Sequence, residues 1–103
     1  MDRWLGKIAL VTGASSGIGA SVTEKLARAG VKVYGLARRV EKVKELKEKV
    51  GGVKGEIIPL KGDVSSEEEV LKTFKTIKEK SGKIHILVNN AGVARRGFFT
   101  GEL

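Results

Sequence analysis

Short apolar runs alternate with helical stripes of apolar residues along most of the chain, and this alternation is the strongest constraint on its fold. Four runs have the length and composition of strands: residues 7–12, 31–36, 56–60 and 84–89. Three segments between them carry apolar residues at every third or fourth position: residues 17–29, 40–50 and 66–81. Strands separated by helices run parallel, because each helical crossover returns the chain to the same end of the sheet.

The strand sequences are nearly continuous apolar runs, which is typical of a sheet covered by helices on both faces. We therefore predict an α/β fold, a Rossmann-type open parallel sheet of about four strands in the order 3-2-1-4. Pro59 lacks the N–H that a central strand needs, so it predicts an edge position or a strand end. Ser65 and Ser66, followed by Glu68 and Glu69, predict a capping box at the start of the third helix.

The chain has 20 lysines and arginines against 12 aspartates and glutamates, which gives a net charge of +8. Such an excess attracts anions: nucleic acids, membrane surfaces or phosphorylated small molecules. The basic residues alternate with glutamates at helical spacing, however, and this is more typical of solvated helix faces with i,i+4 pairs. We therefore expect neither a nucleic acid nor a membrane as partner.

No apolar run approaches the ~18–20 residues that span a bilayer, and the first residues show no secretory signal. The chain contains no cysteine, which excludes disulfides, thiolate nucleophiles and cysteine-bound metals. These features predict a cytoplasmic protein.

Three glycines, Gly13, Gly17 and Gly19, lie between the first strand and the first helix in the sequence TGASSGIG. A helix N-terminus presents unpaired N–H groups and a partial positive charge, which suit a phosphate group. Glycine lets the backbone approach that phosphate closely, and the hydroxyls of Ser15 and Ser16 add further donors. A tight turn without a ligand would explain the same glycines, so the turn alone leaves both interpretations open.

The turn has the pattern Thr-Gly-x-x-x-Gly-Ile-Gly, and the fourth predicted strand leads into LVNNAG at residues 87–92. With Asp63-Val64 after the third strand, these motifs resemble those of the short-chain dehydrogenase/reductase family over nearly the whole chain. The opening residues and the sequence GLARR resemble its NADP-type members related to farnesol dehydrogenases. The resemblance implies a partial dinucleotide-binding domain over residues 1–103. The implied cofactor-binding residues are Gly13, Ser15, Ser16, Gly17, Ile18, Gly19, Arg38, Arg39, Asp63, Val64, Asn90, Ala91 and Gly92.

The end of the second predicted strand indicates which dinucleotide is bound. Ala37 stands where an acid would bind the ribose 2′-hydroxyl of NAD. Arg38 and Arg39 follow it with planar, permanently charged donors that suit a 2′-phosphate. The resemblance therefore implies NADP, with Arg38 at the 2′-phosphate, although Ser16 departs from relatives that carry a basic residue there. The alternative is that both arginines are solvated cations at the start of a helix.

The catalytic groups of the family, a Ser, a Tyr-x-x-x-Lys pair and an Asn, lie downstream of its Asn-Asn-Ala-Gly segment. The one tyrosine, Tyr34, lies inside the second predicted strand with no lysine four positions later. The one histidine, His85, lies in the fourth predicted strand between two isoleucines. We expect both to be structural, and we assign no catalytic and no metal-binding residue.

The resemblance implies the N-terminal, cofactor-binding part of an NADP-dependent oxidoreductase that acts on a small alcohol or carbonyl compound. We expect the segment alone to be inactive and marginally stable, and an oligomer to need the downstream part. A non-catalytic NADP-binding module is the alternative, and a Ser and a Tyr-x-x-x-Lys beyond Leu103 would distinguish the two. In a third hypothesis, the chain binds anions through its basic charge and the glycine turn is purely structural.

Overall fold

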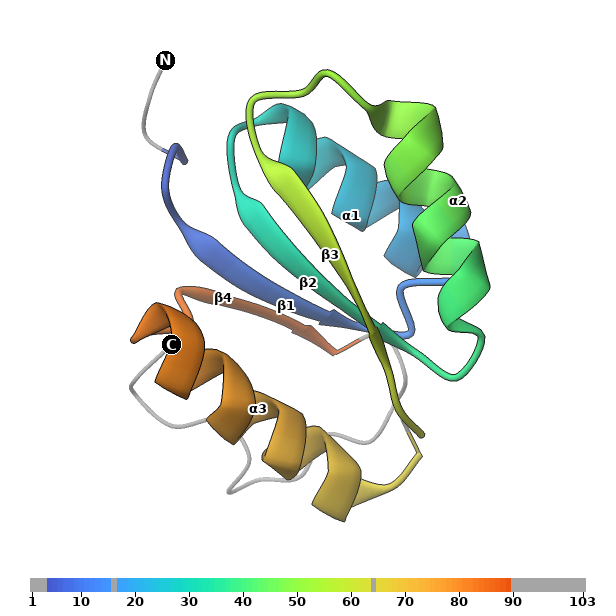
Figure 1. Cartoon of the computed structure of the whole chain (residues 1–103), viewed down its shortest axis with the longest axis vertical. Helices are drawn as coiled ribbons and strands as arrows, with labels where there is room; N and C mark the ends of the chain where they lie inside the picture. The colour runs from blue at the N-terminus through green and yellow to red at the C-terminus, as the bar shows by residue number, and fades with distance from the viewer. Residues whose placement is uncertain (1–3, 16, 64, 90–103) are drawn as a thin grey trace.

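The computed structural model describes residues 4–15, 17–63 and 65–89. They form a four-stranded parallel sheet in the order β3-β2-β1-β4, with three helices (Figure 1). The strands are β1 (Ile8–Thr12), β2 (Lys32–Ala37), β3 (Glu56–Lys61) and β4 (Ile86–Asn89). The helices are α1 (Gly17–Arg28), α2 (Val40–Val50) and α3 (Glu67–Ser81). The predicted fold class, strand direction and strand order are confirmed.

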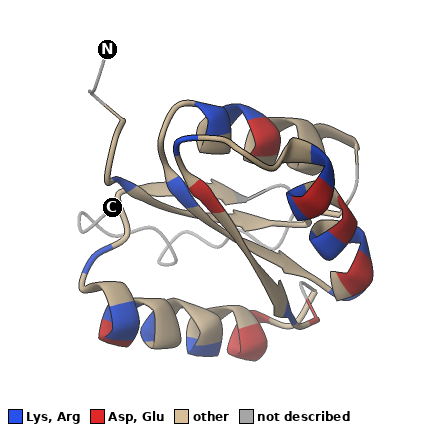
Figure 2. Cartoon of the chain, turned by 45° about the horizontal axis from the view of Figure 1, so that its top comes forward, with Lys and Arg blue, Asp and Glu red and all other residues tan. Residues whose placement is uncertain are grey.

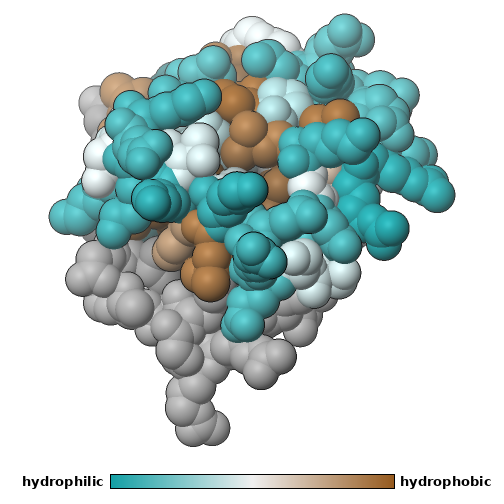
Figure 3. Space-filling model, turned by 60° about the horizontal axis from the view of Figure 1, so that its bottom comes forward, coloured by the Kyte–Doolittle hydropathy of each residue, from teal (hydrophilic) through white to brown (hydrophobic). Residues whose placement is uncertain are grey.

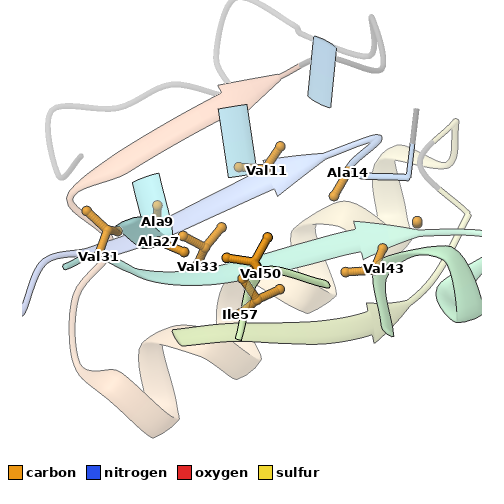
Figure 4. Close-up of a cluster of buried hydrophobic side chains, with 10 residues drawn as sticks. Ala9, Val11, Ala14, Ala27, Val31, Val33, Val43, Val50 and Ile57 are labelled. Atoms are coloured by element: carbon orange, nitrogen blue, oxygen red, sulfur yellow. The ribbon is translucent and has the colours of Figure 1, made fainter. Parts of the chain in front are cut away.

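Helices cover both faces of the sheet, with α1 and α2 on one face and α3 on the other (Figure 1). Successive residues of a strand point to opposite faces. In β1, Ala9 and Val11 belong to the core beneath α1 and α2 (Figure 4). Ile8 and Leu10 belong to the core beneath α3. Because both faces are covered, all five residues of β1 are buried, and this explains the continuous apolar sequence.

Strand β3 is an edge strand of the described sheet, since it pairs only with β2. Its Pro59 lies opposite Gly35 of β2. A proline can occupy an edge strand because no neighbour on the open side needs its missing N–H. The edge position predicted from Pro59 is therefore confirmed.

Strand β4 begins at Ile86, two residues later than predicted, because His85 takes a different role. The N–H of His85 donates to the carbonyl of Ile8 at 2.8 Å, and its ring Nδ1 accepts the N–H of Ile8 at 3.0 Å. The ring thus takes the place of a backbone acceptor at the start of the β1–β4 pair. Burial lowers the pKa of His85, and the positive charges of Lys7 and Lys83 lower it further. The prediction that His85 lies within the strand is wrong, but its structural role is confirmed.

Helix α3 has its charges ordered along its axis. Three glutamates occupy the first turn, and two lysines flank one glutamate in the last turn, so the net charge at each end complements the helix dipole (Figure 2). Beneath it, Tyr34 is only 3% exposed and its hydroxyl makes a hydrogen bond with Ser81 Oγ at 2.8 Å. Tyr34 is therefore a core residue, as predicted.

Seen from the side at the bottom of Figure 1, hydrophilic residues cover most of the described surface, with smaller apolar areas between them (Figure 3). Among the described residues, the exposed large apolar side chains are Trp4, Leu5, Ile18 and Leu71. No helix within the described residues is long and apolar enough to cross a membrane.

Candidate functional site

The four parallel strands end at one edge of the sheet. Thr12 at the end of β1 lies opposite Leu36 of β2 and opposite Asn89 of β4, and Leu36 lies opposite Leu60 of β3. The buried Thr12 hydroxyl also donates to the carbonyl of Val88 at 3.4 Å. In open α/β sheets ligands bind in the crevice at this carboxyl edge, so the segments that follow β1, β2 and β3 are the candidate site.

The glycine turn is anchored to the neighbouring strand. The N–H groups of Gly13 and Ala14 both donate to the carbonyl of Leu36, at 2.9 and 3.2 Å. Gly13 has φ +69°, a conformation that favours glycine. In β2, a Cβ on Gly35 would lie 3.0 Å from the Ala14 Cβ, so a second glycine allows the turn to pack this closely. The shape of the turn is thus set by β2 as well as by its own sequence.

Helix α1 begins at Gly17, and no described heavy atom lies within 4 Å of the position where a Cβ on Gly17 would stand. Packing within the described residues therefore does not require glycine here. The first turn of α1 also has no acidic residue, whereas the first turns of α2 and α3 do. An open backbone at the positive end of a helix, with no carboxylate nearby in that turn, fits a phosphate group.

The other implied residues of this turn differ in exposure. Ile18 is 73% exposed, so its side chain is accessible to a ligand. Gly19 is buried, and its carbonyl accepts the Thr23 hydroxyl at 2.8 Å inside α1. Ser15 is half-buried in the turn. Ser16 lies outside the described residues.

A hollow of about 330 Å³ lies beside the ends of β2 and β3. Arg38, Lys61, Gly62, Asp63 and Glu69 line it. Hydrogen bonds from the Ser65 hydroxyl and N–H hold the pKa of the Asp63 carboxyl below its usual range, and the Arg38 guanidinium lowers it further. The fold therefore brings together two of the implied residues, Arg38 and Asp63, that are far apart in the sequence.

Arg39 is exposed and stands at the N-cap position of α2, where its side chain makes no capping hydrogen bond. Val64, Asn90, Ala91 and Gly92, which the sequence also implied, lie outside the described residues. The described residues contain no group of three or more His, Cys, Asp or Glu side chains that could hold a metal ion.

Sequence reasoning missed three residues near this edge: Gly35, Lys61 and Glu69. Gly35 shows no signal of its own, because its need for a missing Cβ appears only when β1 and β2 are paired. Lys61 and Glu69 reach the hollow only because the chain turns between β3 and α3. Lys61 directly follows the predicted strand 56–60, and this position could have been noticed, because the implied residue Arg38 also follows a strand.

The parallel sheet, its order and the glycine turn at the carboxyl edge together define a dinucleotide-binding α/β domain. Residues 7–102 match the sequence model described as short chain dehydrogenase. The chain belongs to this family.

Among its relatives, farnesol dehydrogenase of Aedes aegypti is 53% identical over 97 residues, covering 93% of this chain and 40% of the relative. Dehydrogenase/reductase SDR family member 11 of Gallus gallus is 47% identical over 97 residues, covering 92% of this chain and 38% of the relative. The chain thus spans about two fifths of the length of these curated relatives.

Solved structures show the same fold. The crystal structure of hydroxysteroid dehydrogenase from Escherichia coli superposes with a TM-score of 0.77 at 32% identity, covering 87% of this chain and 37% of that one. A metagenomic short-chain oxidoreductase in complex with NADP superposes with a TM-score of 0.76 at 35% identity, covering 87% of this chain and 41% of that one.

Proposed function

We propose that this chain is the cofactor-binding part of an NADP-dependent oxidoreductase that acts on an alcohol or carbonyl compound in the cytoplasm. The observation that carries the choice of NADP is the end of β2. Ala37 leaves no carboxylate at the position that would bind a ribose 2′-hydroxyl, and Arg38 follows at the rim of the hollow, with Lys61 beside it. The NADP complex of a metagenomic relative with the same fold supports this choice.

In this proposal the chain binds and orients the dinucleotide. The open backbone at Gly17 and the N-terminus of α1 hold the pyrophosphate, Arg38 holds the 2′-phosphate, and Asp63 contacts the adenine. The bound cofactor supplies or accepts the hydride. Tyr34 does not serve as the proton donor in this proposal, because its hydroxyl is buried under α3 and bonded to Ser81. We therefore propose that residues 1–103 alone do not catalyse the reaction.

The proposal is tested by measuring the affinities of NADPH and NADH for the wild type and for Arg38→Ala by calorimetry. A hydrogen bond to a charged group contributes about 1.5–3 kcal/mol, so Arg38→Ala should weaken NADPH binding about 10–100-fold. NADH binding should change less than about threefold. Lys42→Ala is the matched control, since Lys42 is an exposed cation in the first turn of α2 that does not line the hollow. Equal affinity of the wild type for both nucleotides would refute the assignment of Arg38.

A further inference from the structure

Asp63 lies between β3 and α3, and both its backbone N–H and its backbone carbonyl are hydrogen-bonded. The Asp63 N–H donates to Glu69 Oε1 at 2.7 Å, and its carbonyl accepts the N–H of Ser66 at 2.9 Å. One carboxylate oxygen, Oδ1, accepts both the N–H and the hydroxyl of Ser65, at 2.9 and 2.6 Å. No described group donates to the other oxygen, Oδ2. Asp63 is therefore fixed in place with one carboxylate oxygen left for a ligand.

Glu69 reaches further than a capping box requires. In that motif, the glutamate three residues after the N-cap would accept the N–H of the N-cap residue, here Ser66. Ser66 Oγ does accept the N–H of Glu69 at 3.3 Å, so one half of the motif is present. The Ser66 N–H is already bonded to Asp63, however, and the Glu69 carboxylate extends past the N-cap to the Asp63 N–H. Glu69 thereby joins the first turn of α3 to Asp63.

Gly62 provides the room for this contact. A Cβ on Gly62 would lie 2.8 Å from Leu36 Cδ1 and 3.5 Å from Glu69 Oε1. Leu36 is fully buried near the end of β2, two residues before Arg38. The turn is therefore packed between the core and the Glu69 carboxylate, at the hollow that Arg38 and Lys61 also line.

We propose that Glu69 is a positioning residue for the adenine end of the dinucleotide. This inference rests on the proposed function, which places the Asp63 carboxylate at the adenine. Glu69 does not touch the ligand itself in this proposal, but fixes the backbone that carries Asp63. A segment that is ordered before binding loses less conformational freedom when the ligand arrives, and affinity rises accordingly.

Two probes separate the ends of the cofactor in the whole protein: 2′,5′-ADP for the adenine end and reduced nicotinamide mononucleotide for the other. Glu69→Ala should weaken 2′,5′-ADP binding about 5–10-fold, the value of one lost hydrogen bond, and leave the mononucleotide within about twofold. Glu69→Gln should retain affinity, since its amide oxygen accepts the same bond. Glu69→Asp should lose it, because the shorter side chain keeps the charge but not the reach.

Glu68→Ala is the matched control, because it removes the same charge from the same turn of α3 and the Glu68 side chain makes no hydrogen bond within the described residues. Hydrogen exchange of the Asp63 amide gives a readout without ligand: it should become faster in Glu69→Ala and stay unchanged in Glu68→Ala. If Glu69→Ala does not fold, Glu69→Gln and Glu69→Asp are compared instead. This comparison shows whether affinity depends on an acceptor that reaches the Asp63 N–H or on the negative charge.

Equal losses of 2′,5′-ADP affinity in Glu69→Ala and Glu68→Ala would show that the loss comes from removing a negative charge and would overturn the inference. Full affinity in Glu69→Asp with loss in Glu69→Gln would overturn it in the same way. If the wild type and Glu69→Ala bind 2′,5′-ADP with the same affinity, only the role of Glu69 is refuted. A wild type that does not bind 2′,5′-ADP would refute the proposed function, and the inference with it.

Discussion

Replacing Gly17 by alanine should separate cofactor binding from stability. Gly17 begins α1, it does not have a positive φ, and an added Cβ would meet no described heavy atom within 4 Å. An alanine that fits without strain restricts the unfolded chain, which raises the free energy of unfolding by about 0.4–1 kcal/mol. We therefore expect Gly17→Ala to be as stable as the wild type or slightly more stable.

Binding should change in the opposite direction. The added methyl group would occupy the open space through which a phosphate reaches the N–H groups at the start of α1. Two lost hydrogen bonds to a charged ligand, at about 1.5 kcal/mol each at the low end, amount to about 3 kcal/mol. This corresponds to NADPH binding that is about 100-fold weaker.

The assay pairs urea unfolding, for the free energy of unfolding, with calorimetric titration of NADPH. Gly51→Ala is the control, since Gly51 caps the far end of α2 and its added Cβ would make an ordinary contact of 3.4 Å with the carbonyl of Glu48. Wild-type affinity in a folded Gly17→Ala protein would refute the phosphate assignment, and a marked loss of stability would refute the packing argument. Gly13 is a poorer test, because its φ of +69° would strain any other residue.

Three changes test other parts of the fold. Because the pKa of His85 is lowered in the folded chain, the unfolded chain binds more protons than the folded chain below about pH 6.5. The free energy of unfolding should therefore fall from pH 7 to 5, and it should fall less in His85→Gln. Equal dependence on pH in the thermal unfolding of both proteins would refute this. Tyr34→Phe removes the bond to Ser81 and should lower the free energy of unfolding in urea by about 1 kcal/mol, whereas no change would show that the bond contributes nothing. Gly55→Ala would place its Cβ 2.7 Å from the Ala27 carbonyl oxygen and should cost about 2–4 kcal/mol in the same assay; wild-type stability would contradict the predicted clash.

The sequence predicts most of this fold because its signals are local. Apolar periodicity places every element, and short crossovers impose parallel strands, so the bounds of the seven elements agree to within two residues. The fourth strand is the least accurate. A histidine between two isoleucines looks like a strand residue, and its side chain bond to Ile8 appears only when β1 and β4 lie side by side.

The candidate site is predictable to the extent that its residues follow strand ends. Gly13, Arg38 and Asp63 each follow a different strand, and the carboxyl ends of parallel strands share one edge. The glycine turn could be recognised from its place between strand and helix, whereas Asp63 is implied by the family resemblance alone. The contact of Glu69 escapes prediction because its carboxylate could accept the N–H of Ser66 or the N–H of Asp63, and the local sequence pattern favours Ser66. The capping box predicts a bond to Ser66, but the structure gives Glu69 to Asp63.

The hydrogen bonds from Gly13 and Ala14 to the carbonyl of Leu36 affect whether the glycine turn can be moved into another protein. The conformation of the glycine turn depends on a strand that is synthesised later, so the turn cannot settle before β2 has paired with β1. A synthetic peptide that ends after α1 would lack this carbonyl and would sample many turn conformations. The conformation of the glycine turn is therefore a product of tertiary structure, and a designer who moves TGASSGIG to another scaffold must move the second strand with it.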